Sequence, residues 1–171
     1  MKLFLCGFSG AGKTTLAEKL SSSDSFGVFD LDEEIFNRMG SGHDHLGDYI
    51  EEIGLDEFRK DEIDMIKVLH QNFKDNYLIV LGGGAIESPE ILEHIKNING
   101  KLIYISTDFE TCYSRLQNEN DRPLMKKGKV YMKELYDKRL PIYKQSADVE
   151  LSDSQVANLF KIADLTALVD N

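Results

Sequence analysis

Short apolar runs alternate along the chain with longer stretches in which apolar positions recur at helical spacing. The run Tyr77–Leu81 is uninterrupted and rich in branched residues, which is typical of a central strand in a parallel sheet. The expected strands are Lys2–Cys6, Gly27–Asp30, Tyr77–Leu81, Lys101–Ile105 and Asp148–Leu151. The expected helices are Lys13–Leu20, Glu33–Met39, Leu55–Phe73, Pro89–Lys96, Phe109–Gln117, Tyr131–Lys144 and Gln155–Leu168.

This alternation predicts an α/β fold in which a parallel sheet is covered by helices on both faces. In such sheets, ligands bind beyond the carboxyl ends of the strands, so residues that directly follow a strand are the first candidates for chemistry. Two polar stretches, Met39–Gly47 and Asn118–Lys129, are expected to form mobile loops. The length of 171 residues favours a single domain over residues 1–171.

Composition narrows the choice of partners and compartment. The chain has 20 Lys and Arg against 30 Asp and Glu, and the net charge of −10 argues against nucleic acid and anionic membranes as partners. Cys6 and Cys112 lack the spacing of a metal or redox motif, which favours buried thiols in a reducing compartment. The chain starts in a core strand rather than a signal peptide, and no apolar run reaches transmembrane length. We therefore expect a cytoplasmic protein, and a monomer.

The most specific motif is the segment Gly7–Thr14, GFSGAGKT, which fits the pattern G-x-x-x-x-G-K-[ST] of a loop that wraps nucleotide phosphates. It lies between an expected strand and an expected helix. Its glycines allow several backbone N–H groups to converge on one anion, and the helix behind adds the positive end of its dipole. Lys13 would reach the outer phosphates, and the Thr14 hydroxyl would hold Mg²⁺. An incidental glycine-rich turn is the alternative.

Two acids follow the second expected strand. Asp30 and Asp32 alternate in a segment expected to be extended, which would place both carboxylates on one side. One acid near the phosphate loop would hold Mg²⁺ through water, and the other would orient a hydroxyl nucleophile or accept its proton. Asp32 would equally suit the acidic first turn of a helix, so that alternative stays open.

Three glycines, Gly82, Gly83 and Gly84, follow the run Tyr77–Leu81. Consecutive glycines are entropically unfavourable, so they indicate a place where a ligand approaches the backbone closely or where N–H groups turn toward an anion. A flexible turn between strand and helix is the alternative.

Arginine is the rarer basic residue in this chain. Bulk surface charge comes from lysine, which favours forked binding of carboxylate or phosphate for the arginines, with an ordinary surface position as the alternative. The arginines are Arg38, Arg59, Arg115, Arg122 and Arg139. The segment His43–His45 offers metal-ligand side chains, but adjacent loop residues rarely converge on one ion, so a solvated loop is expected there.

Taken together, these segments resemble the shikimate kinase family, a member of the nucleoside-monophosphate-kinase-like group of P-loop proteins. The resemblance extends from Leu3 to about Leu151. The matching segments are Gly7–Thr15, Asp30–Asp32, Gly54–Glu62, Leu81–Ala85, Arg122–Leu124 and Arg139–Tyr143. Many families share the phosphate loop alone, whereas the ordered set is far more specific.

The resemblance implies a three-layer sandwich with a five-stranded parallel sheet of order 2-3-1-4-5, of the P-loop NTPase type. It implies ATP-dependent phosphorylation of the 3-hydroxyl of shikimate, a step toward chorismate and the aromatic amino acids, with ATP and Mg²⁺ required. It also implies a substrate-binding region at about 31–62 and a lid at about 118–130.

The resemblance assigns roles to individual residues as well. The implied catalytic residues are Lys13, Asp32 and Arg122. The implied nucleotide contacts are Gly10, Ala11, Gly12, Lys13, Thr14, Thr15, Arg115 and Arg122, with Arg115 over the adenine and Arg122 in the lid near the transferred phosphate. The implied shikimate contacts are Asp32 at the hydroxyls, Gly82, Gly83 and Gly84 along the pocket, and Arg59 and Arg139 at the carboxylate. The implied metal ligands are Thr14 and Asp30.

Two other functions remain open at this point. A small-molecule kinase of gluconate type on the same fold would share Lys13 and Thr14, but it would not need the pair Arg59 and Arg139. A regulatory module of a different class would bind a nucleotide without turning it over.

Overall fold

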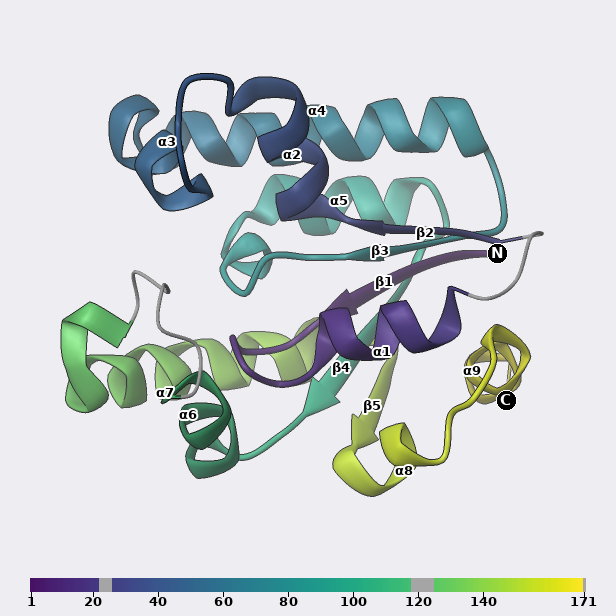
Figure 1. Cartoon of the computed structure of the whole chain (residues 1–171). Helices are drawn as coiled ribbons and strands as arrows, with labels where there is room; N and C mark the ends of the chain where they lie inside the picture. The colour runs from purple at the N-terminus through teal and green to yellow at the C-terminus, as the bar shows by residue number, and fades with distance from the viewer. Residues whose placement is uncertain (22–25, 118–124, 171) are drawn as a thin grey trace.

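In the computed structural model, which describes residues 1–21, 26–117 and 125–170, the described chain forms a five-stranded parallel sheet of order β2-β3-β1-β4-β5 (Figure 1). The strands are β1 (Lys2–Cys6), β2 (Gly27–Asp30), β3 (Tyr77–Val80), β4 (Lys101–Ser106) and β5 (Val149–Ser152). The helices are α1 (Lys13–Leu20), α2 (Leu31–Met39), α3 (Leu46–Ile53), α4 (Leu55–Phe73), α5 (Pro89–Asn97), α6 (Phe109–Gln117), α7 (Gly128–Ser146), α8 (Asp153–Ala157) and α9 (Ile162–Val169), with 3-10 turns η1 (Ala85–Glu87) and η2 (Met125–Lys127). The predicted α/β class and strand order are confirmed.

The helices cover both faces of the sheet (Figure 1). Helix α1 carries the chain from β1 past β3 to the edge strand β2, whereas α4, α5 and α7 carry it toward the opposite edge. Because parallel crossovers are right-handed, this reversal of direction places α1 on the face opposite α4, α5 and α7. Every residue of β3 is buried, as the apolar run predicts for an interior strand.

The strand register brings the carboxyl ends of four strands together at one end of the sheet. Asp30 at the end of β2 pairs with Val80 at the end of β3, and Cys6 at the end of β1 pairs with Tyr104 near the end of β4. The segments that follow these strands therefore start side by side. The phosphate loop, the acids after β2 and the three glycines after β3 are brought to the same place by topology alone.

The chain after β2 differs from the expectation. Helix α2 begins at Leu31 rather than Glu33, so Asp30 and Asp32 do not alternate along an extended segment as expected. The reason is that the Asp30 side chain accepts hydrogen bonds from the backbone N–H groups of Asp32 and Glu33 and so caps the helix. Helix α3 (Leu46–Ile53) was not expected; its first turn is closed by reciprocal hydrogen bonds between His45 and Asp48.

The C-terminal region also differs, because the single helix expected at Gln155–Leu168 is two short helices, α8 and α9. Ser152 and Gln155 form a capping box that starts α8 directly after β5. The Asp164 carboxylate accepts the backbone N–H groups of Phe160 and Lys161, which starts α9. Two capping signals inside one periodic stretch divide it. In the parts of the chain that the structure covers, no helix combines the length and apolarity needed to cross a membrane.

Replacing Ser88 by Ala should lower the free energy of unfolding by about 1 kcal/mol. Ser88 directly precedes Pro89, the first residue of α5, and its hydroxyl accepts a hydrogen bond from the Ile91 N–H in the first turn. Urea denaturation of the wild type and variant measures the difference. Ser88→Asp keeps an acceptor at the same place and should stay near wild-type stability. Equal stability of the alanine variant would contradict the cap.

Candidate active site

The phosphate loop folds around glycines that no other residue could replace without strain. Gly10 has a φ of 80°, and a methyl group there would lie 2.5 Å from the carbonyl oxygen of Cys112 in α6. Gly12 has a φ of 93° and is the residue from which α1 starts. Both positions require the left-handed region that favours glycine. The loop therefore lies tightly against α6, with its curve set by these two residues.

The Lys13 side chain lies back along the loop. It is buried, and its ammonium donates hydrogen bonds to the carbonyl oxygens of Gly7, at 2.8 Å, and Phe8, at 3.1 Å. These contacts hold a positive charge inside the curve of the loop, where the N-terminal end of α1 adds its dipole. The arrangement is electrostatically suited to an anion, although the protein as a whole is acidic.

Thr14 and Asp30 join the phosphate loop to the end of β2. The Thr14 hydroxyl donates to one carboxylate oxygen of Asp30 at 2.8 Å, while the other oxygen accepts the backbone N–H of Asp32 at 3.1 Å. Asp30 thus links the start of α1 to the start of α2. A hydroxyl and a carboxylate side by side are hard oxygen donors of the kind that Mg²⁺ prefers.

Charged side chains from three helices converge on the glycines after β3. A methyl group at Gly82 would lie 2.7 Å from Oδ1 of Asp32 and 3.3 Å from Oε1 of Glu62. A methyl group at Gly84 would overlap the Arg59 guanidinium and would lie 2.7 Å from Nη2 of Arg139. A side chain at either position would displace these groups. Close approach to the backbone therefore explains the glycines better than a flexible turn does.

Arg59 forms an ion pair with Glu62, one turn further along α4. The Glu62 side chain is fully buried, and its second oxygen, Oε1, has no hydrogen-bond partner in the described structure. Burial raises the pKa of Glu62 to about 7; the Arg59 charge opposes this, whereas the nearby Asp32 carboxylate adds to it. Glu62 is therefore a carboxyl group that titrates near neutrality beside a fixed positive charge.

Arg139 reaches the same glycines from α7. The helix is tied to them by Tyr143, whose hydroxyl donates to the Gly83 carbonyl at 2.6 Å and whose ring stacks on Tyr104 of β4. Arg139 is one helical turn before Tyr143, on the same face of α7. Its guanidinium is paired with the Glu87 carboxylate at 2.7 Å.

Arg115 lies beside the phosphate loop on the far side from these glycines. Its Nη1 donates to the Gly10 carbonyl at 3.2 Å, and its Nη2 is 3.6 Å from the Asp153 carboxylate, which also accepts a hydrogen bond from the Thr107 hydroxyl. A cavity of about 370 Å³ opens here. Its lining includes Ala11, Gly12, Thr15, Arg115, Asp153 and Val156. It adjoins the phosphate loop.

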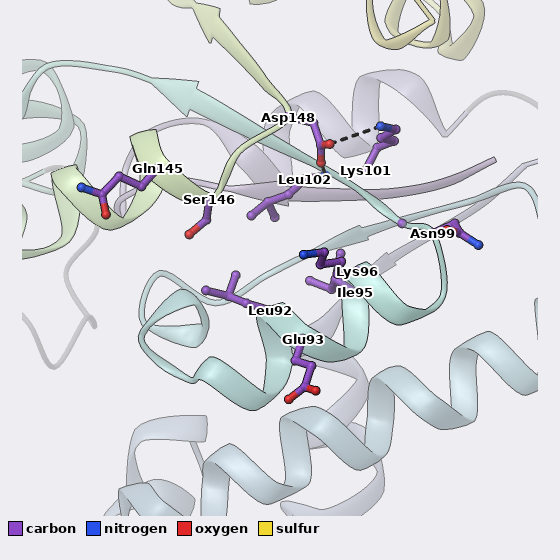
Figure 2. Close-up of a pocket in the computed structure, with 11 residues that line it drawn as sticks. Leu92, Glu93, Ile95, Lys96, Asn99, Lys101, Leu102, Gln145, Ser146 and Asp148 are labelled. Atoms are coloured by element: carbon purple, nitrogen blue, oxygen red, sulfur yellow. Dashed lines mark hydrogen bonds and ion pairs between the residues drawn. The ribbon is translucent and has the colours of Figure 1, made fainter.

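A second cavity, of about 660 Å³, lies at the opposite end of the sheet (Figure 2). Side chains from α5, the end of α7 and the start of β4 surround it, among them Leu92, Ile95, Leu102 and Ser146, and the Lys101–Asp148 ion pair closes one side (Figure 2). It faces the amino ends of the strands and is separated from the phosphate loop by the length of β4. It is therefore not part of the candidate active site.

The structure brings together the predicted residues of the phosphate loop, Asp30 and Asp32, the glycines Gly82–Gly84, and the pair Arg59 and Arg139, while their ligand roles stay predictions. Arg122 and most of the expected lid lie outside the described residues. Glu62 ends the matching segment Gly54–Glu62 but was given no role, and the acids Glu87 and Asp153 were not predicted. Sequence signals were available for Glu62 and Asp153. Glu62 follows Arg59 at the i and i+3 spacing of a helical ion pair, and Asp153 lies inside the Ser152–Gln155 capping box after β5. No local signal marks Glu87.

A family model described as Shikimate kinase matches residues 9–166. The chain belongs to the shikimate kinase family. A shikimate kinase of Persephonella marina is 34% identical over 152 residues, which cover 88% of this chain and 87% of the relative. A shikimate kinase of Pasteurella multocida is 32% identical over 172 residues, which cover 99% of this chain and 95% of the relative.

Solved structures of the shikimate kinase family agree with this membership. The enzyme of Aquifex aeolicus has a TM-score of 0.76 and 30% identity, with 99% of each chain covered. The enzyme of Acinetobacter baumannii, determined in complex with shikimate, has a TM-score of 0.76 and 26% identity, with 88% of this chain and 82% of that chain covered. The chain is thus an enzyme of a kinase family that uses ATP and a small-molecule acceptor.

Glu62→Gln should change how stability depends on pH. The folded-state pKa of Glu62 is raised from an ordinary value of 4.5 to about 7. Protonated Glu62 therefore stabilises the folded protein fully below about pH 4.5, and this stabilisation is lost as the pH rises through 7. The glutamine variant lacks this loss. The difference in free energy of unfolding, variant minus wild type, should increase by up to about 3 kcal/mol between pH 4.5 and pH 8.

Urea denaturation across this pH range measures the difference. Glu57→Gln is the matched control, because Glu57 is exposed on the same helix and pairs with Lys60 at the same i and i+3 spacing. The control should show no comparable slope. A difference for Glu62→Gln that is constant with pH would contradict a raised pKa at this position.

Proposed function

We propose that this chain transfers the terminal phosphoryl group of ATP to the 3-hydroxyl of shikimate. Family membership supports the class of reaction, and one structural observation supports the acceptor: the guanidinium groups of Arg59 and Arg139 meet at Gly84, on the same edge of the sheet as the phosphate loop. A pair of arginines is a fitting receptor for the single carboxylate of a small hydroxy acid.

The nucleotide would occupy the phosphate loop and the adjoining cavity of about 370 Å³. The backbone N–H groups from Gly10 to Thr15 would surround the phosphates, and the Lys13 ammonium would exchange its carbonyl partners for phosphate oxygens. The Arg115 side chain would lie over the base. Arg122, in the expected lid at about 118–130, would approach the transferred group; this role is supported by the resemblance of its sequence segment.

Thr14 and Asp30 would hold Mg²⁺, because their oxygens are adjacent and few carboxylates suffice for this ion. When bound, the ion would supply positive charge that offsets the charge of the phosphate oxygens. Asp30 is already held by its hydrogen bond to the Asp32 backbone, so its carboxylate would need no rearrangement to serve there.

The acceptor would lie against Gly82–Gly84, within the region at about 31–62 and the facing part of α7. Arg59 and Arg139 would bind its carboxylate, and Asp32 would accept hydrogen bonds from its hydroxyls. Held this way, the hydroxyl would face the terminal phosphate, and Asp32 could take its proton as the new bond forms. Phosphoryl transfer depends mainly on such positioning and on charge stabilisation, so no covalent intermediate on the protein is required.

A coupled ATP-turnover assay tests the proposal directly. The wild type should turn over ATP with shikimate, should fail with gluconate, and should lose turnover when EDTA removes Mg²⁺. Phosphorus NMR of the product should show a single ester at the 3-position. Turnover with gluconate in place of shikimate would favour the gluconate-type alternative, and ATP binding without any transfer would favour a regulatory module.

Arg59→Ala should raise the KM for shikimate roughly a hundredfold, because it removes one of two charged partners of the substrate carboxylate and leaves Glu62 without its counter-charge. The KM for ATP should stay close to wild type, since the phosphate loop is untouched. Steady-state kinetics with each substrate varied in turn measures both. Lys60→Ala removes a neighbouring but exposed charge on the same helix and serves as the control. An unchanged shikimate KM in Arg59→Ala would contradict the assignment.

A further inference from the structure

Arg139 has a carboxylate partner to which neither the family resemblance nor the proposed reaction gives a role. The Nε and Nη2 groups of Arg139 both donate to Oε2 of Glu87, at 2.9 and 2.7 Å. The other oxygen, Oε1, accepts from the Lys138 ammonium at 2.7 Å. The Arg139 side chain is only 10% exposed and that of Glu87 22%, so this is not a solvent-separated surface pair.

Backbone and side-chain contacts fix Glu87 relative to the glycines Gly82–Gly84. It ends the 3-10 turn η1, which directly follows Gly82–Gly84, and the next residue, Ser88, caps α5. On the other side, Tyr143 fixes α7 to the Gly83 carbonyl. Both partners of the ion pair are thus anchored to the same three glycines.

Glu87 is charged at neutral pH. Burial by itself raises the pKa of this carboxyl, but the hydrogen bonds and positive charges of Lys138 and Arg139 outweigh it and hold the pKa below its ordinary value. The pair is therefore a carboxylate and a guanidinium rather than a neutral contact, and its hydrogen bonds are of the stronger, charge-assisted kind.

The forked contact fixes the orientation of the whole guanidinium, because that group is planar. One edge, Nε and Nη2, faces Glu87. Nη1 lies near Gly83, where a methyl group would be 3.7 Å from it, whereas the atom of Arg139 nearest to Gly84 is Nη2, 2.7 Å from a methyl group there. Among the described residues, Nη1 has no hydrogen-bond partner in the protein. One edge of Arg139 is thus committed to the protein, and Nη1 remains for a ligand.

We propose that Glu87 is a positioning residue that holds the Arg139 guanidinium in the orientation required to bind the acceptor carboxylate. The proposal rests on the proposed function, because it assumes an anionic acceptor at Arg59 and Arg139. Glu87 itself does not touch the acceptor. It restricts a long side chain with several rotatable bonds to one arrangement, so that the acceptor does not have to order it on binding.

If only charge mattered, removing Glu87 would have the opposite effect on acceptor binding, so the direction of the change in KM tests the proposal. A carboxylate near an anion site repels the anion, so removing it should tighten binding if charge alone mattered. If positioning dominates, removing it should weaken binding, although the net charge of the site becomes more positive. The direction of the change in KM therefore separates the two effects.

Glu87→Ala should raise the KM for shikimate by about tenfold, with the KM for ATP and kcat close to wild type. Glu87→Gln should recover most of this loss, because its carbonyl oxygen can still accept both Arg139 donors. Glu90→Ala is the matched control: it removes the same charge from an exposed position at the start of α5 and should leave all three constants unchanged. Circular dichroism and the melting temperature report whether each variant is folded.

An unchanged or lower shikimate KM in Glu87→Ala would overturn the proposal while leaving the proposed function intact, provided that the wild type phosphorylates shikimate. A wild type that does not phosphorylate shikimate overturns both. If Glu87→Ala does not fold, Glu87→Asp provides the measurement, because it keeps the charge but is one methylene too short to reach both donors. Its shikimate KM should also rise, and a wild-type value would overturn the positioning role.

Discussion

The guanidinium groups of Arg59 and Arg139 both lie against the backbone at Gly84, on side chains that are 19% and 10% exposed, and the rest of the site depends on how the repulsion between them is offset. Each has its own carboxylate, Glu62 on α4 and Glu87 at the end of η1. Glu87 pairs with the same Nη2 of Arg139 that lies nearest to Gly84, and the unpaired Oε1 of Glu62 lies beside Gly82, so both counter-charges are close to the glycines.

The two acids differ in environment, and so in what they contribute. The Glu87 carboxylate accepts its hydrogen bonds from the positively charged groups of Lys138 and Arg139. These groups lower its pKa, so Glu87 is a permanent counter-charge. Glu62 is fully buried with one oxygen unpaired, and burial raises its pKa to about 7. A proton on Glu62 would leave Arg59 with a larger net positive charge toward an incoming anion. The site thus combines one fixed and one titratable counter-charge, an arrangement typical of functional sites rather than of surface ion pairs.

Much of this arrangement was predictable because it depends on local pattern and on topology. Apolar runs and helical spacing predicted all five strands to within one residue at either end, and a parallel sheet forces the segments after β1, β2 and β3 to one edge. The chemistry of Gly82–Gly84 indicated a site, with a flexible turn as the alternative. The rarity of arginine favoured anion binding, and the roles of Arg59 and Arg139 came from the family resemblance. Where prediction failed, a side-chain cap outweighed periodicity: Asp30 starts α2 early, and Asp164 divides the C-terminal helix.

The pairings of Glu87 with Arg139 and of Asp153 with Arg115 could not be predicted, for a different reason. Glu87 is 52 residues from Arg139, and Asp153 is 38 residues after Arg115 with no motif between them, so only the folded chain reveals the pairs. Each acid is paired with one arginine: Glu87 with the mostly buried Arg139, and Asp153 with Arg115 in a looser contact of 3.6 Å between side chains that are both 43% exposed. An acidic protein that must bind two anions needs its few cations to be held in place, because a mobile cation would pair with one of many surplus carboxylates instead. Glu62 and Glu87, each paired with one of the two arginines beside Gly84, limit that competition.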